Sequence, residues 1–115
     1  MDVEQLLIYS SWVSGTADAV RFEPLDNTLY IFDLKTGERP ASIDQVVIYA
    51  ALWCLQRNID PYSISFDLRI YSNTKFIMYT TKESGNELSD KISDYMNQII
   101  FVTDTANNYK INKED

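Results

Sequence analysis

The chain has 115 residues and a formal net charge of −7, from 10 Lys and Arg against 17 Asp and Glu. Its composition, 45% hydrophobic, 13% aromatic and 23% charged, is typical of one globular domain with a single core and argues against disorder. The acidic balance argues against a protein that holds nucleic acid by a broad basic surface. It leaves open a metal-assisted enzyme in which divalent ions offset acidic charge where phosphate docks.

The chain has no histidine and one cysteine, Cys54, which limits the catalytic and metal-binding chemistry that it can support. This composition excludes Ser-His-Asp and Cys-His catalysis, histidine-bound zinc, an internal disulfide and an iron–sulfur cluster. Any metal is then held mainly by oxygen, which favours Mg²⁺, Mn²⁺ or Ca²⁺. No apolar run approaches the ~20 residues that span a bilayer, and the N-terminus lacks a signal-peptide pattern. We therefore expect a cytoplasmic protein without a membrane partner.

Three strands are predicted in the first third of the chain. Residues 3–13 are rich in β-branched and aromatic types, and a second strand covers residues 16–23. Residues 24–28 form a turn into a third strand, residues 29–35, which is apolar on both faces before its charged end. Tight turns join antiparallel neighbours, so we expect a meander whose third strand is buried in the middle of the sheet.

A helix, a strand pair and a second helix follow. Residues 42–56 have a helical pattern that starts at a capping box and is apolar around much of its circumference. Residues 62–71 alternate with a period of two and lead through a hairpin into residues 75–80. The last helix is predicted to begin near Ser84 at a second capping box.

These elements predict an α/β fold with a central mixed β-sheet flanked by helices. The sheet combines the antiparallel meander with the strand pair, and the helix of residues 42–56 is the crossover between them. We expect a single domain over residues 1–102. Residues 103–115 are polar and are predicted to form a frayed C-terminal tail.

The charged residues at the end of the third strand suggest a site. Asp33 and Lys35 are two residues apart, so their side chains point to the same side of a strand. Asp18 precedes them on the neighbouring strand. Two carboxylates and a lysine suit metal-dependent phosphodiester hydrolysis, because carboxylates hold Mg²⁺ while an ammonium positions the nucleophile or stabilises the transition state.

Each candidate residue also has a purely structural explanation. Asp18 follows a Gly-Thr turn and can satisfy backbone donors there, while Asp33 and Lys35 can form an ordinary strand-end ion pair. Gln45 can be only the partner in the capping box. Tyr49, four residues later on the same helix face, can be only a core aromatic.

Three segments, in order, resemble the PD-(D/E)XK nucleases, and within them the RecB-type and lambda-exonuclease-like branch. Residues 15–18 (Gly-Thr-Ala-Asp) match the G-x-x-D segment, and residues 33–37 (Asp-Leu-Lys-Thr-Gly) match the D-x-K-T-G form of the (D/E)-x-K core. Residues 45–49 (Gln-Val-Val-Ile-Tyr) match the Q-x-x-x-Y helix motif. The resemblance covers about residues 5–80 and implies a restriction-endonuclease-like core.

The resemblance implies a Mg²⁺- or Mn²⁺-dependent deoxyribonuclease that is exonuclease-like and acts on single- or double-stranded DNA ends. Its setting would be DNA recombination or repair, or the DNA processing of a phage or mobile element. The metal ligands it implies are Asp18, Asp33 and the backbone carbonyl of Leu34. The catalytic residues it implies are Lys35, Asp33 and Asp18, and the residues that support the site and the DNA backbone are Gln45 and Tyr49.

The chain departs from the family in two ways. Family members usually begin with a helix that carries another acidic residue, whereas almost nothing precedes the first predicted strand here. Many relatives also add a histidine ligand or an iron–sulfur cluster, which this composition does not allow. Glu4 and Glu23 are further acidic candidates for the site. A partner chain or a homo-oligomer is expected to supply the missing helix or a basic DNA track.

Two other functions compete with the nuclease. The acidic composition and the missing first helix favour a catalytically inactive nuclease-fold protein that acts as a binding or regulatory module. The third possibility is an acidic phage or mobile-element protein that mimics DNA.

Overall fold

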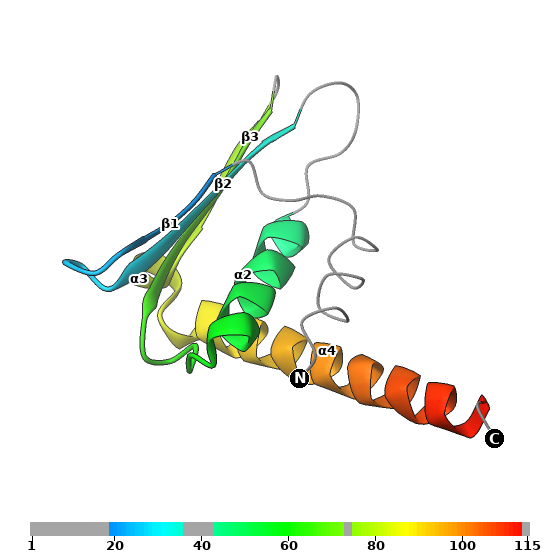
Figure 1. Cartoon of the computed structure of the whole chain (residues 1–115). Coiled ribbons are helices and arrows are strands. Elements are labelled where there is room, and N and C mark those ends of the chain that lie inside the picture. The colour runs from blue at the N-terminus through cyan, green and yellow to red at the C-terminus, as the bar shows by residue number, and fades with distance from the viewer. Residues whose placement is uncertain (1–18, 36–42, 73–74, 114–115) are drawn as a thin grey trace.

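A computed structural model describes residues 19–35, 43–72 and 75–113 (Figure 1). Four strands form one sheet in the order β1-β2-β3-β4: β1 (Ala19–Glu23), β2 (Thr28–Lys35), β3 (Ser65–Ser72) and β4 (Phe76–Thr80). The helices are α2 (Ile43–Arg57), α3 (Thr81–Ser84) and α4 (Asn86–Lys113). The predicted α/β class, with a mixed sheet and flanking helices, is confirmed.

The sheet combines two antiparallel hairpins through one parallel pair. β1 pairs with β2 and β3 with β4 in antiparallel registers, whereas β2 and β3 are parallel and are joined by α2 as a crossover. The β1–β2 turn contains Asn27 at a φ of 53°, a conformation that asparagine tolerates better than most residues. The Asn27 carbonyl accepts a hydrogen bond from the Ser65 amide at 2.9 Å, which ties this turn to the start of β3. The first predicted strand, residues 3–13, lies outside the described residues.

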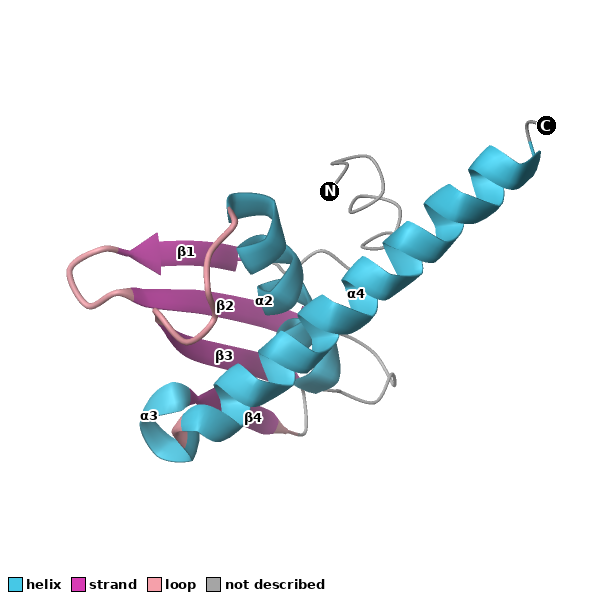
Figure 2. Cartoon of the chain, turned by 90° about the horizontal axis from the view of Figure 1, so that it is seen from below, coloured by secondary structure: helices cyan, strands magenta, loops and turns pink. Residues whose placement is uncertain are grey.

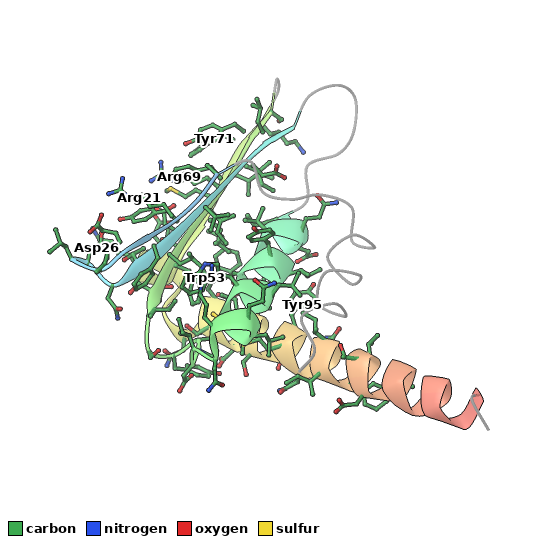
Figure 3. All side chains as sticks on the ribbon, in the orientation of Figure 1. Arg21, Asp26, Trp53, Arg69, Tyr71 and Tyr95 are labelled. Carbon is green, nitrogen blue, oxygen red and sulfur yellow. The ribbon has the colours of Figure 1, made fainter. Side chains whose placement is uncertain are left out.

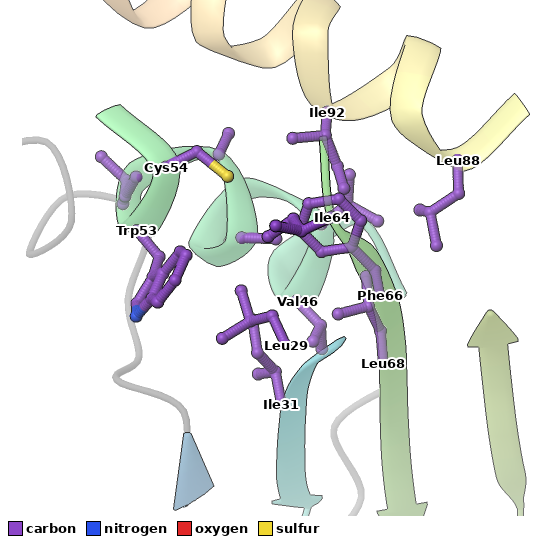
Figure 4. Packing of buried hydrophobic residues seen from close by; sticks show 14 of the residues in the cluster. Leu29, Ile31, Val46, Trp53, Cys54, Ile64, Phe66, Leu68, Leu88 and Ile92 are labelled. Atoms are coloured by element: carbon purple, nitrogen blue, oxygen red, sulfur yellow. The ribbon is translucent and has the colours of Figure 1, made fainter. Parts of the chain in front are cut away.

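Helices α2 and α4 both cover the same face of the sheet (Figures 1 and 2). The core lies between the sheet and these helices, and Figure 4 shows its packing around Phe66. Side chains with an exposed fraction of 1% or less come from β2, β3, α2 and α4: Leu29, Ile31, Val47, Ala50, Ala51, Cys54, Phe66, Leu68, Ile70, Leu88, Ile92 and Ile99. The opposite face of the sheet carries no such layer in the described part of the chain.

Because α2 and α4 cover one face of the sheet, one strand prediction is confirmed and another is corrected. β3 alternates as predicted, with Phe66, Leu68 and Ile70 buried. The prediction that residues 29–35 form a strand in the middle of the sheet is confirmed, since β2 lies between β1 and β3, but this strand is not buried on both faces. In β2, Tyr30 and Phe32 are only partly buried, because they point to the face that the helices do not cover.

The junction between β4 and the helices differs from the predicted capping box at Ser84. The N-cap is Thr80, whose Oγ1 accepts a hydrogen bond from the Glu83 amide at 3.2 Å and starts the short helix α3. The Ser84 hydroxyl donates to the Thr80 carbonyl at 2.7 Å, so Ser84 closes α3 and does not cap α4. Gly85, at a φ of 61°, separates the two helices.

Helix α4 continues to Lys113, through most of the region that was predicted to be a frayed tail. No Gly or Pro follows Gly85 in the sequence. Once a helix is nucleated, each further residue adds one backbone hydrogen bond, so a polar segment can extend it without apolar neighbours. Of the helices in the described part of the chain, none is both long enough and apolar enough to cross a bilayer.

Cys54 provides a test of the core. Its side chain is fully buried on α2, and burial raises the pKa of the thiol from 9.0 to about 12. We expect no reaction with Ellman's reagent at pH 8 in the folded protein, and one reactive thiol per chain in urea. The free energy of unfolding should also fall as pH rises from about 9 towards 12, because only the unfolded chain then forms the thiolate readily. Rapid native labelling at pH 8 would contradict this burial.

Candidate functional site

The carboxyl ends of β2 and β3 meet at one edge of the sheet because the two strands are parallel. Asp33 lies near this end of β2, is paired in register with Ile70, and is 8% exposed. Of the acidic side chains that the structure describes, it is the only buried one. Buried carboxylates occur where hydrogen bonds, a cation or a metal compensate them, and the position of Asp33 near the strand end makes it the strongest site candidate on the helix-covered face.

The residues after Asp33 complete this strand end. Leu34 directs its side chain to the uncovered face and is 60% exposed. Lys35 is the last residue of β2 and is paired in register with Ser72. Its backbone is described, but its side chain lies outside the described part of the structure, so the predicted approach of its ammonium to Asp33 stays a prediction.

Helix α2 carries the two predicted supporting residues. Gln45 lies in its first turn and Tyr49 one turn later, and both are partly buried. Residues four apart are neighbours on a helix surface, as expected. Tyr49 also packs against the hydrophobic core, so it has a structural role whatever else it does.

The acidic candidates Asp18 and Glu4 lie outside the described residues. Glu23 is described, and the structure does not bring it to Asp33. It pairs with Thr28 at the other end of β2, five residues from Asp33, which is about 17 Å along a strand. There its carboxylate accepts hydrogen bonds from the Arg21 guanidinium and from the Leu25 amide, at 3.2 Å for the latter. The bond from Arg21 is the main cause that lowers the pKa of Glu23.

No group of three or more His, Cys, Asp or Glu side chains that could hold a metal ion is found among the described residues. The predicted metal site needs Asp18 together with Asp33, and of these two only Asp33 is among the described residues. The donor chemistry of Asp33 fits a hard divalent ion, because a buried carboxylate oxygen is a preferred ligand of Mg²⁺ and Mn²⁺.

The uncovered face of the sheet carries a second feature, a row of four aromatic side chains. The ring centroids of Tyr30 and Phe32 are 6.4 Å apart, those of Phe32 and Tyr71 6.4 Å, and those of Tyr71 and Phe76 5.0 Å. The Arg69 guanidinium lies 5.4 Å from the Phe32 centroid. In Figure 3 the labelled side chains of Arg69 and Tyr71 extend away from α2.

Arg69 is held in place within this row. Its Nε and Nη2 donate to the two carboxylate oxygens of Asp67 at 2.8 and 3.0 Å, and its Nη1 donates to the Tyr71 hydroxyl at 3.4 Å. The Asp67 carboxylate is the main cause that raises the pKa of Arg69. The cation therefore has a fixed position over the aromatic row.

Two hollows flank Tyr30 on the same face. The larger, about 900 Å³, lies over β2, β3, β4 and α3, and the smaller, about 330 Å³, lies over β1 and β2. Arg21, Glu23 and Asp26 line the smaller one, and Asp67, Arg69 and Met78 are among the residues of the larger. The one signal of this face in the sequence is the apolar pattern of β2, which has apolar side chains on both of its faces.

Comparisons of the chain with protein-family models, with curated proteins and with solved structures gave no match.

Proposed function

We propose that the chain is a Mg²⁺- or Mn²⁺-dependent deoxyribonuclease of the PD-(D/E)XK type that degrades DNA from its ends. The observation that carries the proposal is the buried Asp33 near the carboxyl end of a central strand, with Lys35 two residues later. The hairpin β1–β2, the crossover α2 and the parallel strand β3 support a restriction-endonuclease-like core. An enzyme of this kind would act in the cytoplasm, in DNA recombination or repair or on phage or mobile-element DNA.

The ion would be held by Asp33, Asp18 and the Leu34 carbonyl. The last ladder pair at this end of β1 and β2 is Ala19 with Phe32. Asp33 is the next residue of β2, and Asp18 directly precedes Ala19 in the sequence. This order supports two carboxylates that share one ion. The ion would supply Lewis-acid stabilisation of the phosphate and a more acidic water.

The remaining residues would act on the substrate. The Lys35 ammonium would stabilise charge that develops on the phosphate or position the attacking water. Gln45 would support the site and the DNA backbone from the start of α2, and Tyr49 would fix this helix against the core. The net charge of −7 means that DNA needs a basic track from a partner chain or a second copy.

The proposal is tested with linear single- and double-stranded DNA, Mn²⁺ or Mg²⁺, and the Asp33→Asn variant, which keeps the size of the side chain. We expect metal-dependent shortening of the DNA by the wild type and its loss in the variant. Calorimetry should show Mn²⁺ affinity reduced by more than about tenfold. Asp26→Asn, in the exposed β1–β2 turn, is the matched control and should behave as wild type.

Two results would count against this function. Absence of any DNA degradation by the wild type with either ion would remove the enzyme and leave the second candidate, an inactive nuclease-fold protein that acts as a binding module. The exposed aromatic row favours that candidate. Unchanged Mn²⁺ binding by Asp33→Asn would place the ion elsewhere.

A further inference from the structure

The face of the sheet opposite α2 and α4 is exposed and largely apolar. We call it the open face and define it by Tyr30, Phe32, Leu34, Tyr71, Phe76 and Met78. Four of these side chains are strongly exposed, Leu34 at 60%, Phe76 at 54%, and Tyr71 and Met78 at 39% each. The register places them side by side, with Leu34 opposite Tyr71, and Tyr71 opposite Phe76. A contiguous apolar surface of this kind marks an interaction site.

The residue types of the open face are those of protein interfaces. Aromatic residues, methionine and arginine are enriched in interface cores and supply most binding hot spots. Arg69 is already fixed by Asp67, Phe32 and Tyr71, as described above. A side chain that is ordered before binding loses little conformational entropy on association.

The charge of this face identifies the partner. The charged residues that line its two hollows are three cations and four acids, so their summed charge is −1, whereas the net charge of the whole chain is −7. The cations are Arg21, Arg69 and Lys82, and the acids are Glu23, Asp26, Asp67 and Glu83. Two copies of this acidic chain repel each other least where they meet through such a surface. A two-fold interface is self-complementary, so each copy offers the other the same nearly neutral, apolar surface.

The same charges argue against a nucleic acid on the open face. Single-stranded nucleic acid needs aromatic platforms beside a positively charged groove. Here Arg21 and Arg69 each bond a carboxylate of their own chain, and the local charge is not positive. We therefore propose that the open face binds the open face of a second copy of this chain.

The size of the surface sets the strength of the dimer. The strands β2 and β3 span about 26 Å each, β1 and β4 span about 17 Å each, and neighbouring strands are about 4.8 Å apart, so each copy contributes about 400 Å². The total of about 800 Å² is below the ~1,000 Å² of stable specific interfaces and is typical of a weak, transient one. The dimer is accordingly reversible. It does not depend on the proposed nuclease activity, because it uses neither Asp33 nor a metal.

Sedimentation velocity over a concentration series tests the dimer in metal-free buffer. We expect the wild type to show a reversible monomer–dimer equilibrium. Phe76→Asp should raise the dissociation constant by more than about tenfold, because it places a charge on the apolar open face directly beside Tyr71. Phe101→Asp is the matched control: Phe101 is 71% exposed on α4, and its replacement changes the net charge equally, so dimerisation should stay as in the wild type.

The outcomes separate the proposal from its rivals. Far-ultraviolet circular dichroism of both variants shows whether they are folded, and nuclear magnetic resonance dilution of the wild type should shift signals of the open face. A wild type that stays monomeric at high concentration, or equal effects of the two variants, would overturn the dimer. If the wild type stays monomeric and binds a fluorescent oligothymidine, and only Phe76→Asp loses this binding, the open face would instead be assigned to nucleic acid.

Discussion

Replacing Lys35 with alanine is expected to slow DNA cleavage by about 10²–10⁴-fold, the range for removing a group that stabilises charge or moves a proton in the transition state. Mn²⁺ affinity should change little, because the proposal assigns the ion to Asp18, Asp33 and the Leu34 carbonyl. This separates Lys35→Ala from Asp33→Asn, which should lose metal binding. Single-turnover cleavage of end-labelled DNA at saturating Mn²⁺ measures the effect.

Lys82→Ala is the matched control for this substitution. Lys82 is exposed on α3, which follows β4 at the opposite end of the sheet, and carries the same charge away from the strand end of β2. It should retain the wild-type rate. Cleavage by Lys35→Ala at the wild-type rate would remove the lysine from the proposed mechanism, and an equal loss in both variants would point to a general charge effect on DNA binding.

Replacing Phe66 with alanine is expected to lower the free energy of unfolding by about 3–5 kcal/mol, the usual cost of emptying a fully packed aromatic position. Phe66 is 1% exposed and lies on β3 between the sheet and the helices (Figure 4). The hydrogen bond from its amide to Thr81 Oγ1, at 2.8 Å, involves only the backbone of Phe66 and should survive. Total stabilities are typically about 5–15 kcal/mol, so the variant should be marginally folded.

Urea unfolding followed by circular dichroism measures this loss. Phe76→Ala is the control, because Phe76 is 54% exposed on β4 and its truncation creates no cavity. At low protein concentration, where any dimer dissociates, we expect Phe76→Ala to cost less than about 1 kcal/mol. Similar losses in the two variants would contradict the assignment of the core to the helix-covered face.

The elements that sequence reasoning located correctly have a strong local pattern. β3 alternates between apolar and polar residues, and this period directly gives its buried face. α2 is apolar around much of its circumference, and seven of its residues are buried. The turn between β1 and β2 was recognisable because Pro24, Asp26 and Asn27 are turn-forming types.

The errors occur where distant parts of the chain decide the outcome. The apolar pattern of β2 does not reveal that the described helices all cover one face of the sheet, which leaves Tyr30 and Phe32 on the other face only partly buried. Thr80 and Ser84 are both good N-cap residues, and the structure uses Thr80. For the site, the sequence placed Asp33 at a strand end but could not show its burial, which depends on packing.

Helix α4 has 28 residues and is therefore about 42 Å long, whereas the eight residues of β2 span about 26 Å. Its first half packs through Leu88, Ile92 and Ile99, and its second half extends beyond the sheet (Figure 1). A dye or surface linker attached near the far end of α4 would thus stand clear of both the open face and the strand end of Asp33. The helix offers a built-in spacer for immobilising the protein or for measuring distances between two copies.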